Sequence, residues 1–240
     1  MERWETLWPG GPGFFYDDVL FPPGTDAFLL GAFPRLRPGA LVCDLGAGTG
    51  LVGLLLLARE PSLRLHNVEF QAAPLRLAEK TAAANGFAVF QHPEDLRTMA
   101  DLPETGRFDL VVSNPPYFPE GAGPACQAEA LRLARTEAGC TIFDVCRRAA
   151  RLLRWGGTFA AVYRPERLCD LLEAMRREGL EPKRLRLVQH TAASAPSLVL
   201  AEGRRGGKPG LTVEPPLVLH RPDGGDTEEL EEIYFRRRTE

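Results

Sequence analysis

The residues best suited to chemistry follow an apolar run near the middle of the chain. Residues 108–113 read Phe-Asp-Leu-Val-Val-Ser, and Asn114, Pro115, Pro116 and Tyr117 come directly after them. The side-chain oxygen of Asn114 and the carbonyl of Pro115 can each accept one N–H of a planar amino or amide group. The two prolines restrict the backbone, which keeps the Pro115 carbonyl pointing in one direction. The motif therefore predicts a site that orients a planar nitrogen for methylation.

Such a nitrogen is a poor nucleophile because its lone pair is delocalised, so catalysis at this motif would consist mainly of orientation. Tyr117 offers a flat face on which a base or an amide can stack, a contact worth about 1–3 kcal/mol per base in nucleic-acid complexes. We assign Asn114, Pro115 and Tyr117 as catalytic residues and Pro116 to substrate binding. The alternative is a proline-rich stop after a strand, which is common for isolated Asn-Pro pairs. The motif alone leaves a base and an amide equally open as substrates.

A second motif, Asp44-Leu45-Gly46-Ala47-Gly48-Thr49-Gly50, follows an earlier apolar run. Glycines let the backbone turn tightly and approach a ligand, and the free amides at the start of the next helix favour an anionic group. The dinucleotide fingerprint requires a third glycine where this chain has Leu51. The Asp44 carboxylate would repel a pyrophosphate but can serve the ammonium of a methionine moiety. S-adenosylmethionine therefore suits Asp44, Gly46 and Gly48 better than NAD does.

Three further side chains suit the same nucleoside ligand. Glu69 ends the next apolar run 23 residues after Gly46, where an acid can accept hydrogen bonds from both ribose hydroxyls. Phe70 can pack on the adenine ring, and Asp95 can accept a hydrogen bond from the adenine amino group. The alternatives are an exposed acid at a strand end for Glu69, a core position for Phe70, and a turn or helix cap for Asp95.

Short apolar runs alternate with helical patterns, which favours a parallel sheet covered on both faces. Ligands of such sheets lie beyond the carboxyl ends of the strands, so both motifs are expected to open on one crevice. Residues 206–216 are too rich in Gly and Pro for regular structure. Helices are expected from about Leu51, from Pro74 to Asn85, from a capping box of Thr141 and Asp144 to about Arg154, and from Arg167 to Gly179. The expected strands are 41–44, 64–69, 88–91, 108–114 and 158–163, with 184–190 and 197–202 as an antiparallel edge.

The composition is that of an ordinary globular protein, with 44% hydrophobic and 25% charged residues in 240. No apolar run approaches the roughly 18 residues of a membrane span, and the first ten residues lack a signal pattern, so a soluble, cytoplasmic protein is expected. The five cysteines form no Cys-x-x-Cys pair, so neither a disulfide framework nor a metal site is expected. The net charge of −3 conceals a block, residues 121–208, with 16 basic and nine acidic side chains. Such a block permits a nucleic-acid partner.

The two motifs together resemble those of the class I methyltransferases that modify exocyclic amino groups of nucleic acids or glutamine amides of proteins. Within that class, the chain is similar to the bacterial tRNA adenine-N6 methyltransferases that act in the anticodon loop of valine tRNA. Besides residues 114–117, the resemblance rests on segments 21–30, 134–137 and 198–210, and it spans about residues 14–235.

The resemblance implies a Rossmann-like α/β fold with a seven-stranded, mostly parallel sheet, helices on both faces and one antiparallel edge strand. It implies a single domain over residues 1–240, in which residues 1–39 line the cofactor site, with Thr25 in the pocket, and residues 227–240 form a charged tail. The implied cofactor is S-adenosylmethionine and the implied partner is tRNA. A monomer without a metal or a membrane partner is expected. The residues expected to hold tRNA phosphates are Arg135, Arg204, Arg205 and Lys208.

Two other functions compete with this interpretation. A glutamine-N5 methyltransferase of translation release factors would use residues 114–117 in the same way, but those enzymes usually carry a long helical N-terminal domain, whereas about 40 residues precede the first expected strand here. A non-catalytic RNA-binding protein with the same fold would not need Asp44, Gly46 or Asn114. An adenine in an anticodon loop is already outside a continuous duplex, so its extrusion into a pocket costs little. We therefore expect N6-methylation of a tRNA adenine.

Overall fold

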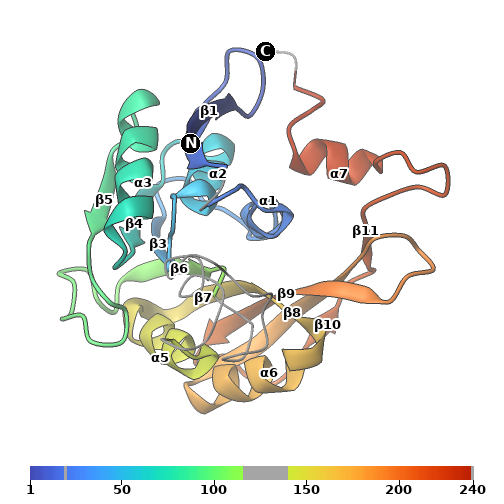
Figure 1. Cartoon of the computed structure of the whole chain (residues 1–240). Helices are drawn as coiled ribbons and strands as arrows, with labels where there is room; N and C mark the ends of the chain where they lie inside the picture. The colour runs from blue at the N-terminus through green and yellow to red at the C-terminus, as the bar shows by residue number, and fades with distance from the viewer. Residues whose placement is uncertain (19–20, 116–139, 239–240) are drawn as a thin grey trace.

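The computed structural model describes residues 1–18, 21–115 and 140–238. These residues form a large sheet with helices on both faces and a small hairpin beside it (Figure 1). The hairpin consists of β1 (Glu2–Thr6) and β2 (Gly13–Asp17). The large sheet contains β3 (Leu41–Leu45), β4 (Arg64–Val68), β5 (Val89–His92), β6 (Phe108–Ser113), β7 (Leu153–Tyr163), β8 (Leu180–Gln189), β9 (Pro196–Arg205), β10 (Thr212–Val213) and β11 (Leu217–Val218). The helices are α1 (Thr25–Ala32), α2 (Leu51–Arg59), α3 (Ala72–Ala84), α5 (Ile142–Leu152), the 3₁₀ turn η1 (Pro165–Arg167), α6 (Leu168–Arg177) and α7 (Glu228–Ile233).

The large sheet has the order β10-β8-β9-β7-β6-β3-β4-β5, and β11 also pairs with β8. Strands β3 to β7 are mutually parallel where they pair, which confirms the expected Rossmann-like α/β fold. Within the described residues, the seven expected strands are joined by two strands of two residues each, β10 and β11. Residues 206–216 are therefore not wholly irregular as expected, because β10 pairs with β8 in a parallel manner.

The antiparallel strand lies inside the sheet and not at its edge as expected. Strand β7 reaches β8 through α6, and this crossover makes β8 run in the same direction as β7. The short connection of residues 190–195 then brings β9 back between them, antiparallel to both. The outer neighbours of β8 are β10 and β11.

The sequence signals at the start of α5 are confirmed. The Asp144 amide donates to the Thr141 hydroxyl at 3.3 Å, and the Thr141 amide donates to the Asp144 carboxylate at 3.1 Å, which completes the capping box. The helix ends at Leu152, two residues earlier than expected, because Leu153 has an extended backbone and β7 begins there. Gly156, with a φ of 77°, lies where the pairing of β7 with β6 is irregular.

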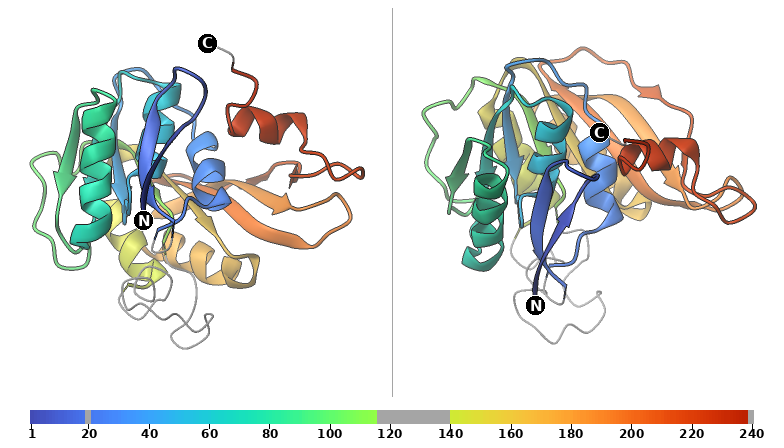
Figure 2. Two further views of the ribbon diagram at one scale, coloured as in Figure 1. Left: turned by 45° about the horizontal axis from the view of Figure 1, so that its top comes forward. Right: turned by 90° about the horizontal axis from the view of Figure 1, so that it is seen from above.

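Helices lie on both faces of the large sheet (Figure 2). Apolar side chains are buried between the helices and the sheet as two clusters. Helices α1 and α2 cover one face with residues such as Leu30 and Leu55. Helices α5 and α6 cover the other face with residues such as Val145 and Met175. Burial on both faces explains why β3 and β6 read as nearly continuous apolar runs.

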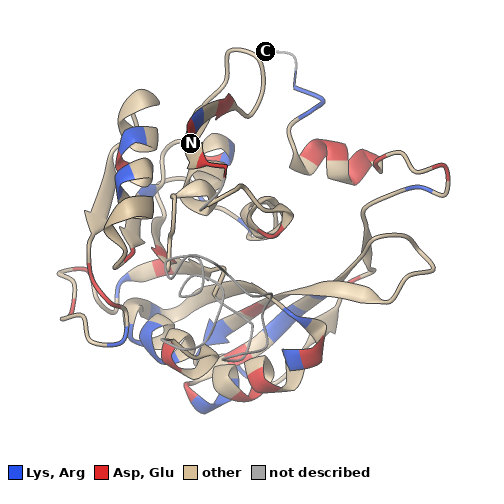
Figure 3. Cartoon of the chain, in the orientation of Figure 1, with Lys and Arg blue, Asp and Glu red and all other residues tan. Residues whose placement is uncertain are grey.

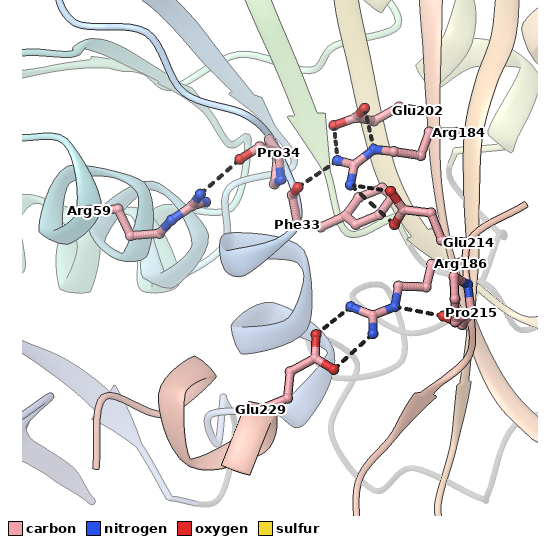
Figure 4. Close-up of polar contacts among 9 residues, drawn as sticks. All are labelled: Phe33, Pro34, Arg59, Arg184, Arg186, Glu202, Glu214, Pro215 and Glu229. Atoms are coloured by element: carbon pink, nitrogen blue, oxygen red, sulfur yellow. Dashed lines mark hydrogen bonds and ion pairs between the residues drawn. The ribbon is translucent and has the colours of Figure 1, made fainter. Parts of the chain in front are cut away.

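Arginines of β8 connect the late strands to α1 and α7 (Figure 4). The Arg184 guanidinium donates to both Glu202 oxygens at 2.9 and 2.6 Å and to the Phe33 carbonyl at 2.6 Å. It also lies 3.8 Å from the centroid of the Phe33 ring. Arg186 donates to both oxygens of Glu229, in α7, at 2.5 and 2.8 Å.

Residues 227–238, the described part of the expected charged tail, contain a helix and buried side chains. They contain α7, in which Leu230 is buried, and Phe235 is buried directly after the helix. The hydrophobic positions were hidden in the sequence because charged residues surround them on both sides. The segment packs against the same apolar cluster as α1.

The β1–β2 hairpin was not identified from the sequence. It packs on α3, since the amides of Gly13 and Phe15 donate to the side chains of Asn85 and Thr81, each at 2.9 Å. Across residues 1–18, 21–115 and 140–238, no helix is both long and apolar enough to cross a membrane. The same residues include no group of three or more His, Cys, Asp or Glu side chains that could hold a metal ion.

Candidate active site at the carboxyl ends of β3, β4 and β6

The two sequence motifs lie side by side because β3 and β6 are parallel neighbours. Asp44 pairs in register with Val112, so the glycine loop (residues 46–50) and Asn114 leave the sheet at the same edge. The buried hydroxyl of Ser113 donates to the Leu45 carbonyl at 2.7 Å. This bond connects the last residue of β6 directly to the residue before the glycine loop. The expectation that both motifs share one edge is therefore confirmed.

The glycine loop has the backbone that its sequence requires. Gly46, Gly48 and Gly50 have φ values of 72°, 55° and 76°, a region that side chains other than glycine rarely adopt. The Gly46 and Ala47 amides both donate to the Val68 carbonyl, at 2.9 and 3.0 Å, which fixes the start of the loop to the end of β4. A β-carbon at Gly46 or Gly48 would have no heavy atom within 4 Å. The loop therefore borders open space in which a ligand can approach the backbone.

Asp44 is a buried carboxylate beneath this loop. It is 1% exposed, and within the described part of the chain its Oδ2 atom has no hydrogen-bond partner. Burial raises the pKa of Asp44 to about 7, and the nearby charge of Glu69 adds to the rise, whereas the Gly53 amide in the first turn of α2 opposes it. An unpaired buried oxygen of this kind is costly unless a donor satisfies it. A positively charged donor group is the ligand feature that suits it best.

Glu69 follows β4 and supports the loop from the other side. Its carboxylate accepts hydrogen bonds from the Gly48 amide at 3.0 Å and the Gln71 amide at 2.8 Å. The side chain is 6% exposed, and burial raises its pKa. Each carboxylate oxygen has a further lone pair, so Glu69 can also accept from a ligand hydroxyl.

Asn114 presents an acceptor at the same edge. Its Oδ1 atom is buried and has no hydrogen-bond partner among the residues that the structure describes, and Pro115 beside it is buried. An N–H group that reached this atom would satisfy it and would be held close to the glycine loop. Pro116, Tyr117 and Arg135, which the sequence also assigned to the site, lie outside the described residues.

The remaining cofactor-site candidates differ in their surroundings. Phe70 is 51% exposed, so its ring is open to contact. Asp95 is engaged by Arg97, whose Nε atom lies 2.9 and 3.0 Å from the two carboxylate oxygens and lowers the Asp95 pKa. At the start of α1, the Thr25 hydroxyl accepts a hydrogen bond from the hydroxyl of Tyr234 at 3.0 Å.

Three of the expected phosphate-binding residues, Arg204, Arg205 and Lys208, do not lie with Asn114. Strand β9 runs antiparallel to β7, and Arg204 pairs with Thr158, whereas Val199 pairs with Tyr163 at the carboxyl end of β7. Arg205 donates to the carbonyl of Leu153, the first residue of β7. These residues therefore lie at the opposite, amino edge of the parallel strands.

Sequence reasoning missed three residues that shape this edge: Ser113, Arg97 and Tyr234. Ser113 directly precedes the motif, and a polar residue ending an apolar strand was an available signal. Arg97 lies two residues after Asp95, a spacing at which an ion pair can form locally. The contact of Tyr234 with Thr25 joins positions 209 residues apart, and no local pattern indicates it.

Comparison with known proteins agrees with this geometry. The family model for the methyltransferase small domain matches residues 12–173. A tRNA1(Val) (adenine(37)-N6)-methyltransferase of Dickeya chrysanthemi is 34% identical over 198 residues, which cover 80% of this chain and 76% of the relative. Another of that name from Parabacteroides distasonis is 29% identical, with 78% of each chain covered.

A solved structure from Agrobacterium tumefaciens, described as a predicted O-methyltransferase, has the same fold, with a TM-score of 0.72 at 19% identity. The alignment covers 90% of this chain and 98% of that one. The resemblance inferred from the motifs is confirmed by the family model and by the curated relatives. The chain belongs to the methyltransferase small domain family.

Proposed function

We propose that the protein transfers a methyl group from S-adenosylmethionine to the N6 nitrogen of an adenine in the anticodon loop of a tRNA, of the valine type. The observation that carries the proposal is the buried, unpartnered Oδ1 of Asn114 at the edge that also holds the glycine loop. An acceptor in this position suits an N–H group. The relatives that cover most of the chain are named as adenine-N6 methyltransferases of tRNA1(Val).

The residues at the glycine loop fit the cofactor. The unpartnered Oδ2 of Asp44 can accept from an ammonium group, and the open space at Gly46 and Gly48 can hold the methionine moiety close to the backbone. Glu69 has lone pairs left for ribose hydroxyls after its two amide contacts. The exposed Phe70 can pack on adenine. When bound, S-adenosylmethionine supplies a methyl group on a positively charged sulfur.

The residues of the chain contribute orientation and polarisation. The Asn114 oxygen accepts one N–H of the adenine amino group, and the Pro115 carbonyl is the acceptor proposed for the other. Two acceptors raise the electron density on the nitrogen and hold its lone pair in one direction, which is the main requirement for a delocalised amine. No general base is needed before attack, because the nitrogen becomes acidic as the new N–C bond forms. Tyr117 and Pro116 are proposed to hold the base in position.

The proposed contact between Asp95 and the adenine of the cofactor carries a condition. Its carboxylate is already bound by Arg97, so an adenine amino group would have to share or replace that partner. We keep Asp95 as a cofactor residue on this condition. We also propose that the protein acts in the cytoplasm, since tRNA is its proposed substrate. We propose a monomer as its oligomeric state.

Methyl transfer to unmodified RNA tests the proposal directly. The full chain is incubated with methyl-labelled S-adenosylmethionine and an unmodified valine tRNA transcript, and the RNA is digested to nucleosides. We expect the label in N6-methyladenosine, from a position in the anticodon loop. A transcript in which the loop adenine is replaced by guanosine serves as the control and should remain unlabelled. Transfer to a release-factor glutamine, with none to RNA, would instead establish the protein amide as substrate.

A further inference from the structure

Arginines gather at the amino edge of the parallel strands, opposite the active site. Arg35 and Arg37 precede β3, Arg154 is the second residue of β7, and Arg204 is the next-to-last residue of the antiparallel β9. Arg204 pairs with Thr158, so the end of β9 lies beside the start of β7. Figure 3 colours the Lys and Arg residues of the described part of the chain blue.

These four arginines line one cleft of about 170 Å³, which we call the basic cleft. Its acidic lining residues, Asp109 and Glu202, are already bound. Asp109 accepts from Arg154 at 2.7 Å and from the Leu41 amide at 3.0 Å. Glu202 is held by Arg184 from β8.

The other three arginines of the basic cleft, Arg35, Arg37 and Arg204, form no ion pair among the described residues, although the Arg37 charge helps to lower the pKa of Asp109. Arg35 and Arg37 are exposed, so their guanidinium groups are available to a partner from solution. The cleft therefore carries an excess of positive charge and favours an anionic partner.

An exposed tryptophan lies beside the cleft. Trp155 follows Arg154 and is 75% exposed, an unusual exposure for so large an apolar side chain. A β-carbon at Gly206 would lie 2.1 Å from the Trp155 ring, so the ring packs against the backbone at this glycine. The Arg204 side chain donates to the Gly156 carbonyl at 3.1 Å, which holds it next to the tryptophan. Guanidinium groups beside an open aromatic ring form the combination that binds sugar-phosphate backbone and stacks unpaired bases.

We propose that the basic cleft and Trp155 form a second RNA-binding surface, which contacts the tRNA outside the nucleotides held at the active site. The inference rests on the proposed function for the identity of the RNA. Strand β6, with six residues between the two edges, spans about 20 Å. A folded tRNA can extend over that length, so one molecule can contact both edges. Arginines supply affinity through phosphates without reading the sequence.

Binding measured across a salt series tests this surface. The full chain and the variants Arg35→Ala/Arg37→Ala and Trp155→Ala are titrated with an unmodified valine tRNA transcript at several salt concentrations. Each lost phosphate contact lowers the slope of log affinity against log salt by about one, so the double variant should lose about two. Trp155→Ala should weaken binding by roughly 5- to 150-fold, the equivalent of about 1–3 kcal/mol of stacking, with an unchanged slope. Unchanged affinity and slope in both variants would overturn the proposal.

A matched control separates this surface from general charge effects. Arg76 of α3 is exposed and lies outside the basic cleft, so Arg76→Ala should leave affinity and slope near the wild-type values. A loss in Arg76→Ala as large as in the cleft variants would contradict a local contact. The proposed function fails separately, when the wild-type chain methylates no RNA. If the wild-type chain methylates the tRNA but the cleft variants bind it with unchanged affinity, only the proposed second surface is wrong.

Discussion

Among the buried side-chain atoms without a hydrogen-bond partner in the described residues, two lie at the candidate active site: Oδ2 of Asp44 and Oδ1 of Asn114. Leaving a buried acceptor unsatisfied costs about 1–3 kcal/mol, so a stable fold seldom retains such an atom without a use. Both atoms lie near the carboxyl ends of parallel strands, Asp44 in β3 and Asn114 directly after β6, and both strands were predicted from the sequence. At the scale of single residues, the structure thus gives up some stability to keep two acceptors ready for a ligand.

Asn114→Ala isolates the acceptor proposed for the reacting nitrogen. We expect kcat for tRNA methylation to fall by about 10²–10³, the usual effect of removing one polarising hydrogen bond. Because Asn114 Oδ1 has no hydrogen-bond partner among the described residues, removing this atom should have little effect on the melting temperature. The affinity for S-adenosylmethionine, measured by calorimetry, should remain within a few-fold. A variant that keeps wild-type turnover would remove Asn114 from the catalytic role.

Asp44 predicts a pH dependence of cofactor binding. Burial raises its pKa to about 7, and an ammonium group beside it would stabilise the charged carboxylate. Binding below pH 7 must therefore include deprotonation of Asp44, and the affinity for S-adenosylmethionine should weaken about fivefold from pH 7 to pH 6. Calorimetry over pH 5.5–7 measures this change, and Asp44→Asn should bind more weakly and lose the dependence. The same pH profile in both proteins would mean that another group titrates.

The raised pKa of Asp44 also affects the unliganded fold. The protonated carboxyl is favoured in the folded state, so its contribution to stability is complete below the unfolded pKa, near 3.9, and is lost as the pH rises through about 7. Relative to Asp44→Asn, the wild-type free energy of unfolding should therefore decrease between pH 4 and pH 8.

At the scale of elements, the sequence was informative where local chemistry determines structure. The capping box of Thr141 and Asp144 and the glycine loop of residues 46–50 each depend on neighbours within a few positions. The glycine loop and Asn114 could also be predicted to lie side by side, because parallel strands end at the same edge of a sheet. The place of β9 between β7 and β8 could not be predicted. It depends on the crossover through α6, which sets where β8 lies, and on the short connection from β8 to β9. Strands β10 and β11 have two residues each, which is too short for any periodicity.

The arginines of β8 show why these late elements were difficult to predict. Arg184 and Arg186 read as ordinary charged residues, yet their partners come from residue 33 near the start of the chain and residue 229 near its end. Likewise, the ion pair of Asp95 with Arg97 was not anticipated, because Asp95 was considered only for its ligand. The Asp95–Arg97 pair is local and its spacing was an available signal, whereas the distant partners of Arg184 and Arg186 leave no local pattern.

The two arginines of β8 should differ in their contribution to stability. Arg184 and Glu202 are 15% and 11% exposed, so Arg184→Ala leaves a buried carboxylate with its main partner removed. We expect it to lower the free energy of unfolding by about 3–5 kcal/mol in urea titrations. Glu229, the partner of Arg186, is 45% exposed, so Arg186→Ala should cost only about 0–1 kcal/mol. Equal losses of unfolding free energy in the two variants would show that burial of the ion pair does not determine its contribution to stability.

At the scale of the whole molecule, the two ends of the chain meet on α1. Tyr234 stacks on Phe28 at 4.4 Å between ring centroids and donates to the Thr25 hydroxyl. Helix α1 and the described residues 227–238 thus support one another on the face of the sheet that α1 and α2 cover. The sheet then has two functional edges, with the proposed methyl transfer at the carboxyl ends of its parallel strands and the basic cleft at their amino ends. Both edges depend on one rigid set of strands, so ligand binding at either should stabilise the entire chain.

Cofactor binding can test whether the joined chain ends reach the active site. A ligand at 100 times its Kd stabilises the folded state by about 2.7 kcal/mol, which for a chain of this size raises the melting temperature by roughly 5–10 °C. We expect this rise for the wild-type chain with S-adenosylmethionine. In Tyr234→Phe, the ring contact with Phe28 is kept but the bond to Thr25 is lost, so at the same cofactor concentration the rise should be smaller if residues 1–39 line the cofactor site. Arg237→Ala, at an exposed position just beyond the same helix, is the control and should behave as wild type. An equal rise in Tyr234→Phe would show that Thr25 does not contribute to the cofactor pocket.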